Sequence, residues 1–151
     1  LPDLVVAGPG LDTGYGIEIR QQAAVDSAIV FTGMLEGSLK WAAFHGCSAF
    51  ILPSHQENFG VAVVEALACG KPVLITNQIN IWREIYREGA GLVCSDNPES
   101  VTDLLVRWLE LDDSRRKWME EMARQAYLEY FTVEAAAKRL KNTICQINDA
   151  S

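Results

Sequence analysis

Hydrophobic and polar positions follow two alternating patterns along the first two thirds of the chain. Short runs of β-branched and apolar residues predict buried strands, and longer stretches with helical spacing lie between them. The predicted strands are Leu4–Ala7, Ile29–Thr32, Phe50–Leu52, Val73–Thr76 and Leu92–Cys94. The predicted helices between them are Ile17–Asp26, Leu39–His45, Val61–Cys69 and Trp82–Arg87. Strands that are apolar on both faces and alternate with helices indicate a parallel sheet covered on both sides.

After Asp96 the pattern becomes helical only. The predicted helices are Glu99–Leu111, Ser114–Tyr130 and Val133–Ile147, with Asn97, Asp113 and Thr132 as their expected N-caps. Pro98 after Asn97 suits the first turn of a helix. No linker or repeat is visible, so we expect one α/β domain over residues 1–151. Its fold would be Rossmann-like, a parallel sheet with helices on both faces and extra C-terminal helices.

Composition narrows the class of partner. The chain has 151 residues, of which 49% are hydrophobic and 22% are charged, as in ordinary globular proteins. No apolar run approaches the roughly 20 residues of a membrane-spanning helix. A net charge of −7 argues against nucleic acid or an anionic membrane surface as the partner of this domain. A phosphorylated ligand stays possible, because local backbone groups usually hold phosphate.

The N-terminus has no starting Met and no basic leader, so the sequence reads as part of a longer protein. We expect a cytoplasmic location, and peripheral membrane attachment of the full-length protein stays open. The cysteines form no Cys-x-x-Cys pair, and we expect free, mostly buried thiols at Cys47, Cys69, Cys94 and Cys145. The only histidines, His45 and His55, have no cysteine at ligand spacing, so we expect no metal site.

The most informative segment is Ile51–Thr76, which reads strand, loop, helix, glycine turn and strand. The loop Pro53–Asn58 follows a predicted parallel strand, and open α/β sheets bind ligands at that end of their strands. Gly60 stands at the start of the next helix, where a glycine lets a ligand approach the backbone closely. The free N–H groups and the positive dipole end of a helix suit a pyrophosphate.

Glu65 is unusual within that helix, because the residues around it leave no polar face. A helix that is apolar all round is expected to be buried. A lone buried carboxylate costs several kcal/mol unless its lone pairs find donors. Two explanations stay open: an ion pair with Lys40 or Arg83 from nearby helices, or the hydroxyl groups of a ligand.

Glu57 lies eight residues before Glu65, in the loop ahead of the helix. Alone, a loop glutamate is usually a solvated charge. Glu65 stands about 7.5 Å along the helix axis beyond Gly60. A nucleotide-sugar can therefore lie across this helix start, with its pyrophosphate at the N-terminus, its ribose at Glu65, and its sugar at Glu57 and the Asn58–Val61 backbone.

The segment PSHQENFGVAVVEALACGKPV resembles the Glu-x7-Glu donor signature of the GT-B glycosyltransferases, especially glycosyltransferase family 4. LVVAGPG, IVFTGML and INIWREIYREGAGLVCSDNPESVTDLL are similar to flanking parts of the same C-terminal domain. The resemblance covers nearly the whole chain. It implies the C-terminal half of a GT-B fold, and a glycosyltransferase as the full-length protein.

The resemblance also implies residue roles in the central motif. Glu57 would be the carboxylate of the catalytic site and contact hydroxyls of the transferred sugar. Asn58, Phe59 and Gly60 would offer backbone groups to sugar and phosphate, and Glu65 would bind the ribose.

Three residues before the motif gain roles from the same resemblance. Gly8 and Gly10 would line the phosphate region of the cleft, and Met34 would lie near the base. His55 also belongs to the ligand-facing loop and can touch the donor, although a solvated or internally satisfied histidine is the simpler interpretation.

Family members are commonly retaining and need no metal, so we expect no cofactor beyond the UDP-, GDP- or ADP-sugar that serves as donor substrate. An acceptor glycan, lipid or small molecule would be bound mainly by an N-terminal domain that this sequence lacks, in a setting such as polysaccharide biosynthesis. The first strand and helix of the C-terminal domain, with an Arg and a Lys that neutralise the pyrophosphate, also do not appear. We therefore expect the isolated chain to be inactive.

Two other functions stay open at this stage. One is a nucleotide-sugar epimerase of the GT-B fold. The other is a non-catalytic nucleotide-binding or assembly module, because a fold does not determine its function. The spacing of Glu57 and Glu65 around ENFG favours a transferase. The base, the sugar and the acceptor are not determined by the sequence.

Overall fold

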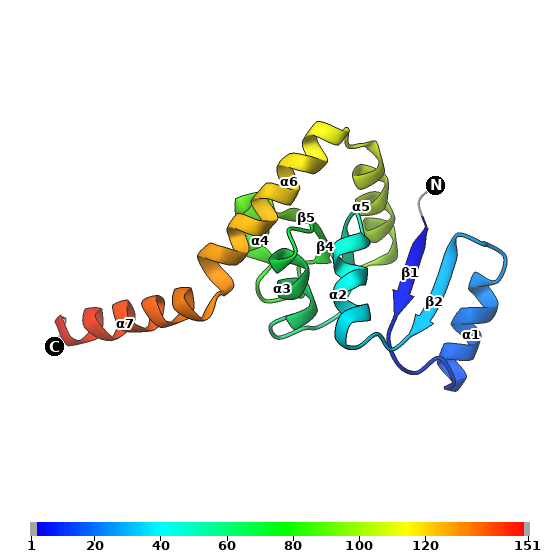
Figure 1. The fold of residues 1–151 in the computed structure, drawn as a ribbon, viewed down its shortest axis with the longest axis horizontal. Helices are drawn as coiled ribbons and strands as arrows, with labels where there is room; N and C mark the ends of the chain where they lie inside the picture. The colour runs from blue at the N-terminus through cyan, green and yellow to red at the C-terminus, as the bar shows by residue number, and fades with distance from the viewer. Residues whose placement is uncertain (1–2, 150–151) are drawn as a thin grey trace. The chain divides into compact units, whose positions relative to one another are not determined.

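The computed structural model describes residues 3–149 and divides the chain into two compact units, residues 1–43 and 44–151 (Figure 1). Each unit is α/β, and every strand pair in it is parallel. Parallel strands alternating with helices are therefore confirmed. The strands form a two-stranded and a three-stranded sheet rather than the one sheet predicted, while the single-domain interpretation stays a prediction.

The first unit contains β1 (Leu4–Ala7), α1 (Gly14–Ala23) and β2 (Ile29–Gly33). Leu4 pairs with Ile29 and Val6 with Phe31, and the register shifts after Val6. β1 has its predicted bounds, and β2 extends one residue further than predicted, to Gly33. The prediction that both strands are buried is wrong, because β1 is largely exposed and β2 alternates between half-buried and exposed residues.

Helix α1 begins at Gly14, three residues earlier than predicted. Thr13 explains the difference, since its hydroxyl accepts the N–H of Gly16 at 3.1 Å and donates to the Gly10 carbonyl at 2.6 Å. A side chain at Gly16 would overlap Gly10, because an added Cβ would lie 2.1 Å from the Gly10 carbonyl oxygen. The absence of a side chain at Gly16 therefore lets the turn at Gly10 pack against the start of α1.

The second unit has a three-stranded sheet in the order β3–β4–β5. Its strands are β3 (Phe50–Leu52), β4 (Val73–Thr76) and β5 (Gly91–Cys94). Helices α3 (Val61–Ala68) and α4 (Trp82–Glu88) connect successive strands, and α2 (Gly37–Gly46), which begins in the first unit and ends in the second, precedes β3. Leu74 pairs with Ile51 on one side and Leu92 on the other, which sets the register.

The central strand β4 is buried along its whole length. Val73 and Ile75 belong to a core cluster with residues of α3, α4 and α6 (Asp113–Ala126). Leu74 faces the other cluster, with Leu104 and Trp108 of α5 (Pro98–Glu110). Alternate residues of one strand thus pack against opposite layers, and this sheet is covered on both faces as predicted.

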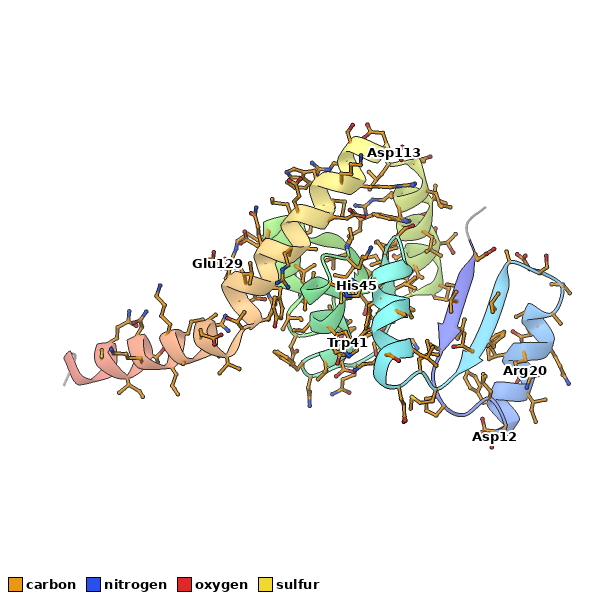
Figure 2. All side chains as sticks on the ribbon, in the orientation of Figure 1. Asp12, Arg20, Trp41, His45, Asp113 and Glu129 are labelled. Carbon is orange, nitrogen blue, oxygen red and sulfur yellow. The ribbon has the colours of Figure 1, made fainter. Side chains whose placement is uncertain are left out.

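The C-terminal helices begin close to their predicted positions. Asn97 caps α5, and Thr132 caps α7 (Val133–Asp149), each through a side-chain oxygen that accepts a backbone N–H. The predicted cap Asp113 is wrong: Asp112 accepts the Arg115 N–H at 2.7 Å, while Asp113 lies inside the first turn of α6 (Figure 2). Asp112 has the extended backbone that a cap requires, and Asp113 instead places its charge at the positive end of the helix.

The predicted helix Ser114–Tyr130 does not stay α-helical to its end. A π-helical turn, η1 (Tyr127–Phe131), follows α6 and precedes α7. Tyr130 of η1 donates a hydrogen bond to Glu88 of α4 at 2.9 Å, and Glu88 also pairs with Arg87 at 3.0 Å. The hydrogen bond from Arg87 lowers the pKa of the Glu88 carboxyl. This polar contact ties η1 to the end of α4.

Within residues 3–149, no helix has both the length and the apolar character needed to cross a bilayer.

Replacing the cap Asn97 with Ala tests the account of α5. The substitution removes the acceptor for the Ser100 N–H, so we expect the free energy of unfolding to fall by about 1 kcal/mol. Chemical denaturation measures the change. Asp103→Ala, an exposed site in the middle of the same helix, is the matched control and should change stability much less. Equal effects of the two substitutions would contradict the assigned cap.

Candidate functional site

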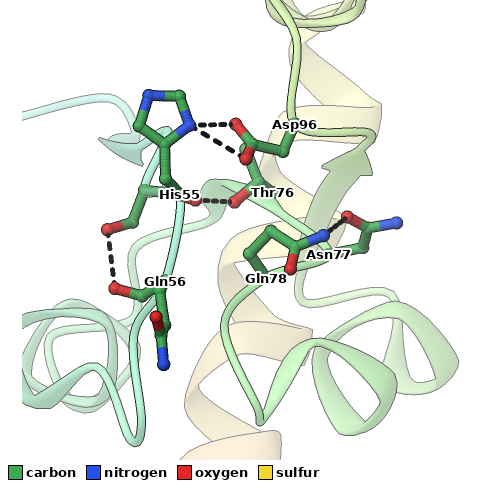
Figure 3. A network of polar contacts seen from close by, with 7 residues as sticks. His55, Gln56, Thr76, Asn77, Gln78 and Asp96 are labelled. Carbon is green, nitrogen blue, oxygen red and sulfur yellow. Dashed lines mark hydrogen bonds and ion pairs between the residues drawn. The ribbon is translucent and has the colours of Figure 1, made fainter.

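The loop Pro53–Gly60 follows β3 and lies at the carboxyl edge of the three-stranded sheet. Its first fixed point is Ser54, whose carbonyl accepts a hydrogen bond from Thr76 Oγ1 at 2.5 Å (Figure 3). Thr76 ends β4 and is fully buried. A buried hydroxyl needs such a partner, so this bond ties the loop to the centre of the sheet.

The backbone of Glu57 is the second fixed point. Its N–H donates to the Gln78 carbonyl, and its carbonyl accepts from the Asn80 N–H, both at 3.2 Å. These bonds form an isolated parallel bridge between Glu57 and Ile79. Glu57 is therefore held against the turn that follows β4, although no regular strand continues there.

The side chain of Glu57 turns toward the start of α3. Its Oε1 accepts the N–H of Gly60 at 3.3 Å, and the residue is half-buried. The carboxylate thus lies beside the backbone groups that the sequence predicts for a ligand, and it already engages one of them.

Gly60 is the N-cap of α3 and has a left-handed backbone, with φ of 71° and ψ of 61°. It is buried, and an added Cβ would lie 3.2 Å from side-chain carbons of both Ile79 and Val63. The left-handed backbone and the close neighbours therefore favour glycine here for stability, a reason beyond the predicted ligand approach. Because no side chain caps α3, its first backbone N–H groups receive no acceptor from a capping residue.

Helix α3 is present as predicted, but its predicted burial on all sides is wrong. The buried face consists of Val63, Ala66 and Leu67. Glu65 is only half-buried, and Val61 is 64% exposed. The 3.6-residue period explains this, since Val61 and Glu65 lie one turn apart on the face opposite the core. The burial of Glu65 is therefore no longer an argument for a ligand at this residue. The argument that remains is the position of Glu65 on the accessible face of α3.

The other predicted contacts of the motif are accessible. Asn58 is exposed, and Phe59 is 48% exposed. The Phe59 ring meets Phe131 of η1 edge to face, with centroids 6.3 Å apart. Phe59 thus anchors the loop on one side of the motif, which the sequence did not indicate.

His55 is paired with Asp96, a residue that sequence reasoning did not single out. Its Nδ1 lies 2.7 Å and 2.9 Å from the two carboxylate oxygens of Asp96 (Figure 3). The expectation of an internally satisfied histidine is met at that nitrogen, while the side chain stays 90% exposed. The signal for Asp96 was topological, because it follows β5 at the same sheet edge as the loop after β3.

Gly8, Gly10 and Met34 lie in the first unit. The Gly8 N–H donates to the Gly33 carbonyl at 2.9 Å, Gly10 has φ of 91°, and Met34 is 58% exposed. Their part in a phosphate and base site together with Glu57 stays a prediction.

The four cysteines are free thiols as predicted, but they are less buried than expected. Cys47, Cys69 and Cys94 are half-buried and Cys145 is exposed. Partial burial raises the pKa of the Cys47, Cys69 and Cys94 thiols. Cys69 Sγ lies 3.8 Å from His45 Nε2, a proximity that sequence spacing did not reveal. Among residues 3–149, no group of three or more His, Cys, Asp or Glu is arranged to hold a metal ion.

Comparison with known proteins decides the family. The family model described as "Glycosyl transferases group 1" matches residues 2–125. The chain belongs to the group 1 glycosyl transferases. The match spans most of both units and includes the whole of the Glu57 loop and α3.

Curated relatives are distant but cover most of the chain. A glycosyltransferase of Methanocaldococcus jannaschii is 28% identical over 92% of this chain. A glycogen synthase of Mycobacterium tuberculosis is 27% identical over 89% of it. The aligned regions are 36% and 32% of those proteins, so the chain spans about a third of their length.

Solved structures confirm the fold. Sucrose-phosphate synthase from Thermosynechococcus elongatus superposes with a TM-score of 0.76 and 21% identity over 99% of this chain and 39% of its own. HepE of Anabaena, solved with UDP and glucose, gives a TM-score of 0.77 and 19% identity over 95% and 40%. The predicted C-terminal half of a GT-B fold agrees with both.

Replacing Gly60 with Ala tests the structural requirement at the start of α3. The left-handed backbone and the contact with Ile79 should lower the free energy of unfolding by about 1–3 kcal/mol. Gly46→Ala is the matched control, because open space surrounds Gly46 and its φ is not positive; it should be neutral or slightly stabilising. Chemical denaturation of both variants distinguishes them, and a neutral Gly60→Ala would contradict this account.

Proposed function

We propose that this chain forms the nucleotide-sugar-binding part of a glycosyltransferase, with the donor bound at the carboxyl edge of β3–β4–β5. One observation carries the proposal. The Glu57 carboxylate lies beside the start of α3, where no side chain caps the helix, and Glu65 lies on the accessible face of that helix.

The diphosphate of the donor would occupy the start of α3. Backbone N–H groups at an uncapped helix start and the positive end of the helix dipole favour anions. Gly60, which has a left-handed backbone, has no side chain that would occupy this position. During transfer, the bond from the diphosphate oxygen to the anomeric carbon breaks, and fixed donors here would stabilise the negative charge that develops.

The ribose would lie along the accessible face of α3, against Glu65. A carboxylate accepts hydrogen bonds at both oxygens, so it suits the paired 2′- and 3′-hydroxyls of a ribose. Val61, one turn earlier on the same face, is exposed and offers apolar contact between the diphosphate and the ribose.

The transferred sugar would lie at Glu57. The backbone bridge to Ile79 and the Gly60 N–H hold this carboxylate in one place, which lets it accept hydrogen bonds from sugar hydroxyls without much loss of entropy. A preorganised carboxylate next to the anomeric carbon is also suited to the positive charge of an oxocarbenium-like transition state.

Relatives of the same fold support the ligand class, since HepE of Anabaena has been solved with UDP-glucose. On the family resemblance, we extend the proposal to a retaining, metal-independent transfer from a UDP-, GDP- or ADP-sugar. The setting would be polysaccharide synthesis in the cytoplasm. The chain spans about a third of the length of its relatives. Acceptor binding would therefore depend on other parts of the full-length protein, and the isolated chain would not catalyse sugar transfer.

One observation favours a second candidate, a non-catalytic module on the same fold. Glu57 already accepts the Gly60 N–H, so the simplest role of its side chain is to stabilise the loop without any ligand. The two candidates differ at Glu65, which is half-buried and lies outside the buried face formed by Val63, Ala66 and Leu67.

Replacing Glu65 with Ala in the full-length protein separates the candidates. Loss of charged hydrogen bonds to the ribose, about 1.5–3 kcal/mol, should weaken binding of the nucleotide-sugar roughly tenfold or more. Calorimetric titration with UDP-, GDP- and ADP-glucose measures this. Glu121→Ala, an exposed glutamate of α6, is the control and should bind like wild type. A Glu65→Ala protein with lower thermal stability and unchanged affinity would support the structural module instead.

A further inference from the structure

The pair formed by His55 and Asp96 joins two loops at the carboxyl edge of the second sheet. The two residues lie 41 positions apart in the sequence, one after β3 and one after β5. Both carboxylate oxygens of Asp96 lie within 2.9 Å of His55 Nδ1. The contact therefore orients one specific ring nitrogen.

Asp96 is well placed to orient a partner. Its side chain is 23% exposed, and its backbone lies between two fixed segments. Before it, the Cys94 carbonyl accepts the Asn77 N–H at 2.9 Å, and after it, Asn97 caps α5. The carboxylate is thus attached to the rigid end of the sheet.

His55 contributes little to packing, because 90% of its side chain is exposed. The loop around it is already held by Thr76 at Ser54 and by the Glu57 bridge. The loop therefore has two anchors besides the His55 ring. An exposed imidazole oriented at Nδ1 by a carboxylate directs Nε2 outward, in a defined tautomer when neutral and as a donor when protonated.

We propose that His55 reads a hydroxyl of the transferred sugar through Nε2, and that Asp96 is a positioning residue that orients its ring. This inference rests on the proposed function. Cα atoms two residues apart lie within about 7 Å. A sugar bound at Glu57 is therefore within reach of the His55 ring, whereas the ribose at Glu65 lies further along α3.

Binding measurements on the full-length protein test this inference. The probes are the nucleotide-sugar bound most tightly among UDP-, GDP- and ADP-glucose, and the matching nucleoside diphosphate. His55→Ala should weaken binding of the nucleotide-sugar about threefold to tenfold, the equivalent of one hydrogen bond. Affinity for the nucleoside diphosphate should stay unchanged, because it carries no transferred sugar.

Asp96 variants test the indirect role. Asp96→Ala should weaken binding of the nucleotide-sugar about twofold to fivefold, since a disordered ring loses part of one hydrogen bond. Asp96→Asn should rescue most of the loss, because its amide oxygen still accepts from Nδ1. In a His55→Ala background, Asp96→Ala should add no further loss. Asp103→Ala, an exposed control on α5, should behave like wild type.

Three results would overturn the inference: unchanged sugar affinity in His55→Ala, a parallel loss for the nucleoside diphosphate, or an additive loss in the double variant. A wild-type protein that binds none of the three nucleotide-sugars would instead contradict the proposed function, and the inference would fall with it. Wild-type binding with a failed His55 test leaves the proposed function intact, so the two failures are distinguishable.

Discussion

The hydrogen bond from the buried Thr76 hydroxyl to the Ser54 carbonyl is the contact on which the candidate site depends. Thr76 ends the central strand, whose alternate residues pack against both covering layers. The bond holds the loop after β3 against the end of that strand. The bridge between Glu57 and Ile79 then continues the same alignment beyond the regular sheet, so that a carboxylate and an uncapped helix start lie side by side.

Two requirements meet at Gly60. The chain must turn sharply from the bridge into α3, which a left-handed residue packed against Ile79 and Val63 achieves. The same residue leaves the helix start without a side-chain cap, which is the arrangement an anionic ligand uses. Folding and binding therefore favour the same amino acid, and stability measurements and binding measurements are both needed to separate its two roles.

Much of the local structure was predictable, because short apolar runs bounded by glycine or proline identify strands well; β1, β3 and β4 have their predicted bounds. Burial was less predictable, since β4 is buried throughout while β1 is largely exposed. Contacts between distant segments were not predictable in this way. Asp96 gained its role only when the fold brought the ends of β3 and β5 to one edge. The burial of Glu65 was overestimated because composition alone cannot show which face of a helix the core covers.

Hydrogen–deuterium exchange on the full-length protein, with and without a saturating nucleotide-sugar, tests the central claim most directly. We expect slower amide exchange on binding in residues 61–63, the first residues of α3, because ligand oxygens would accept the N–H groups that the helix itself leaves without an acceptor, whereas the Val64 N–H already donates to the Gly60 carbonyl. Unchanged exchange in this segment, while protection appears elsewhere and binding is saturated, would contradict a donor site at the start of α3.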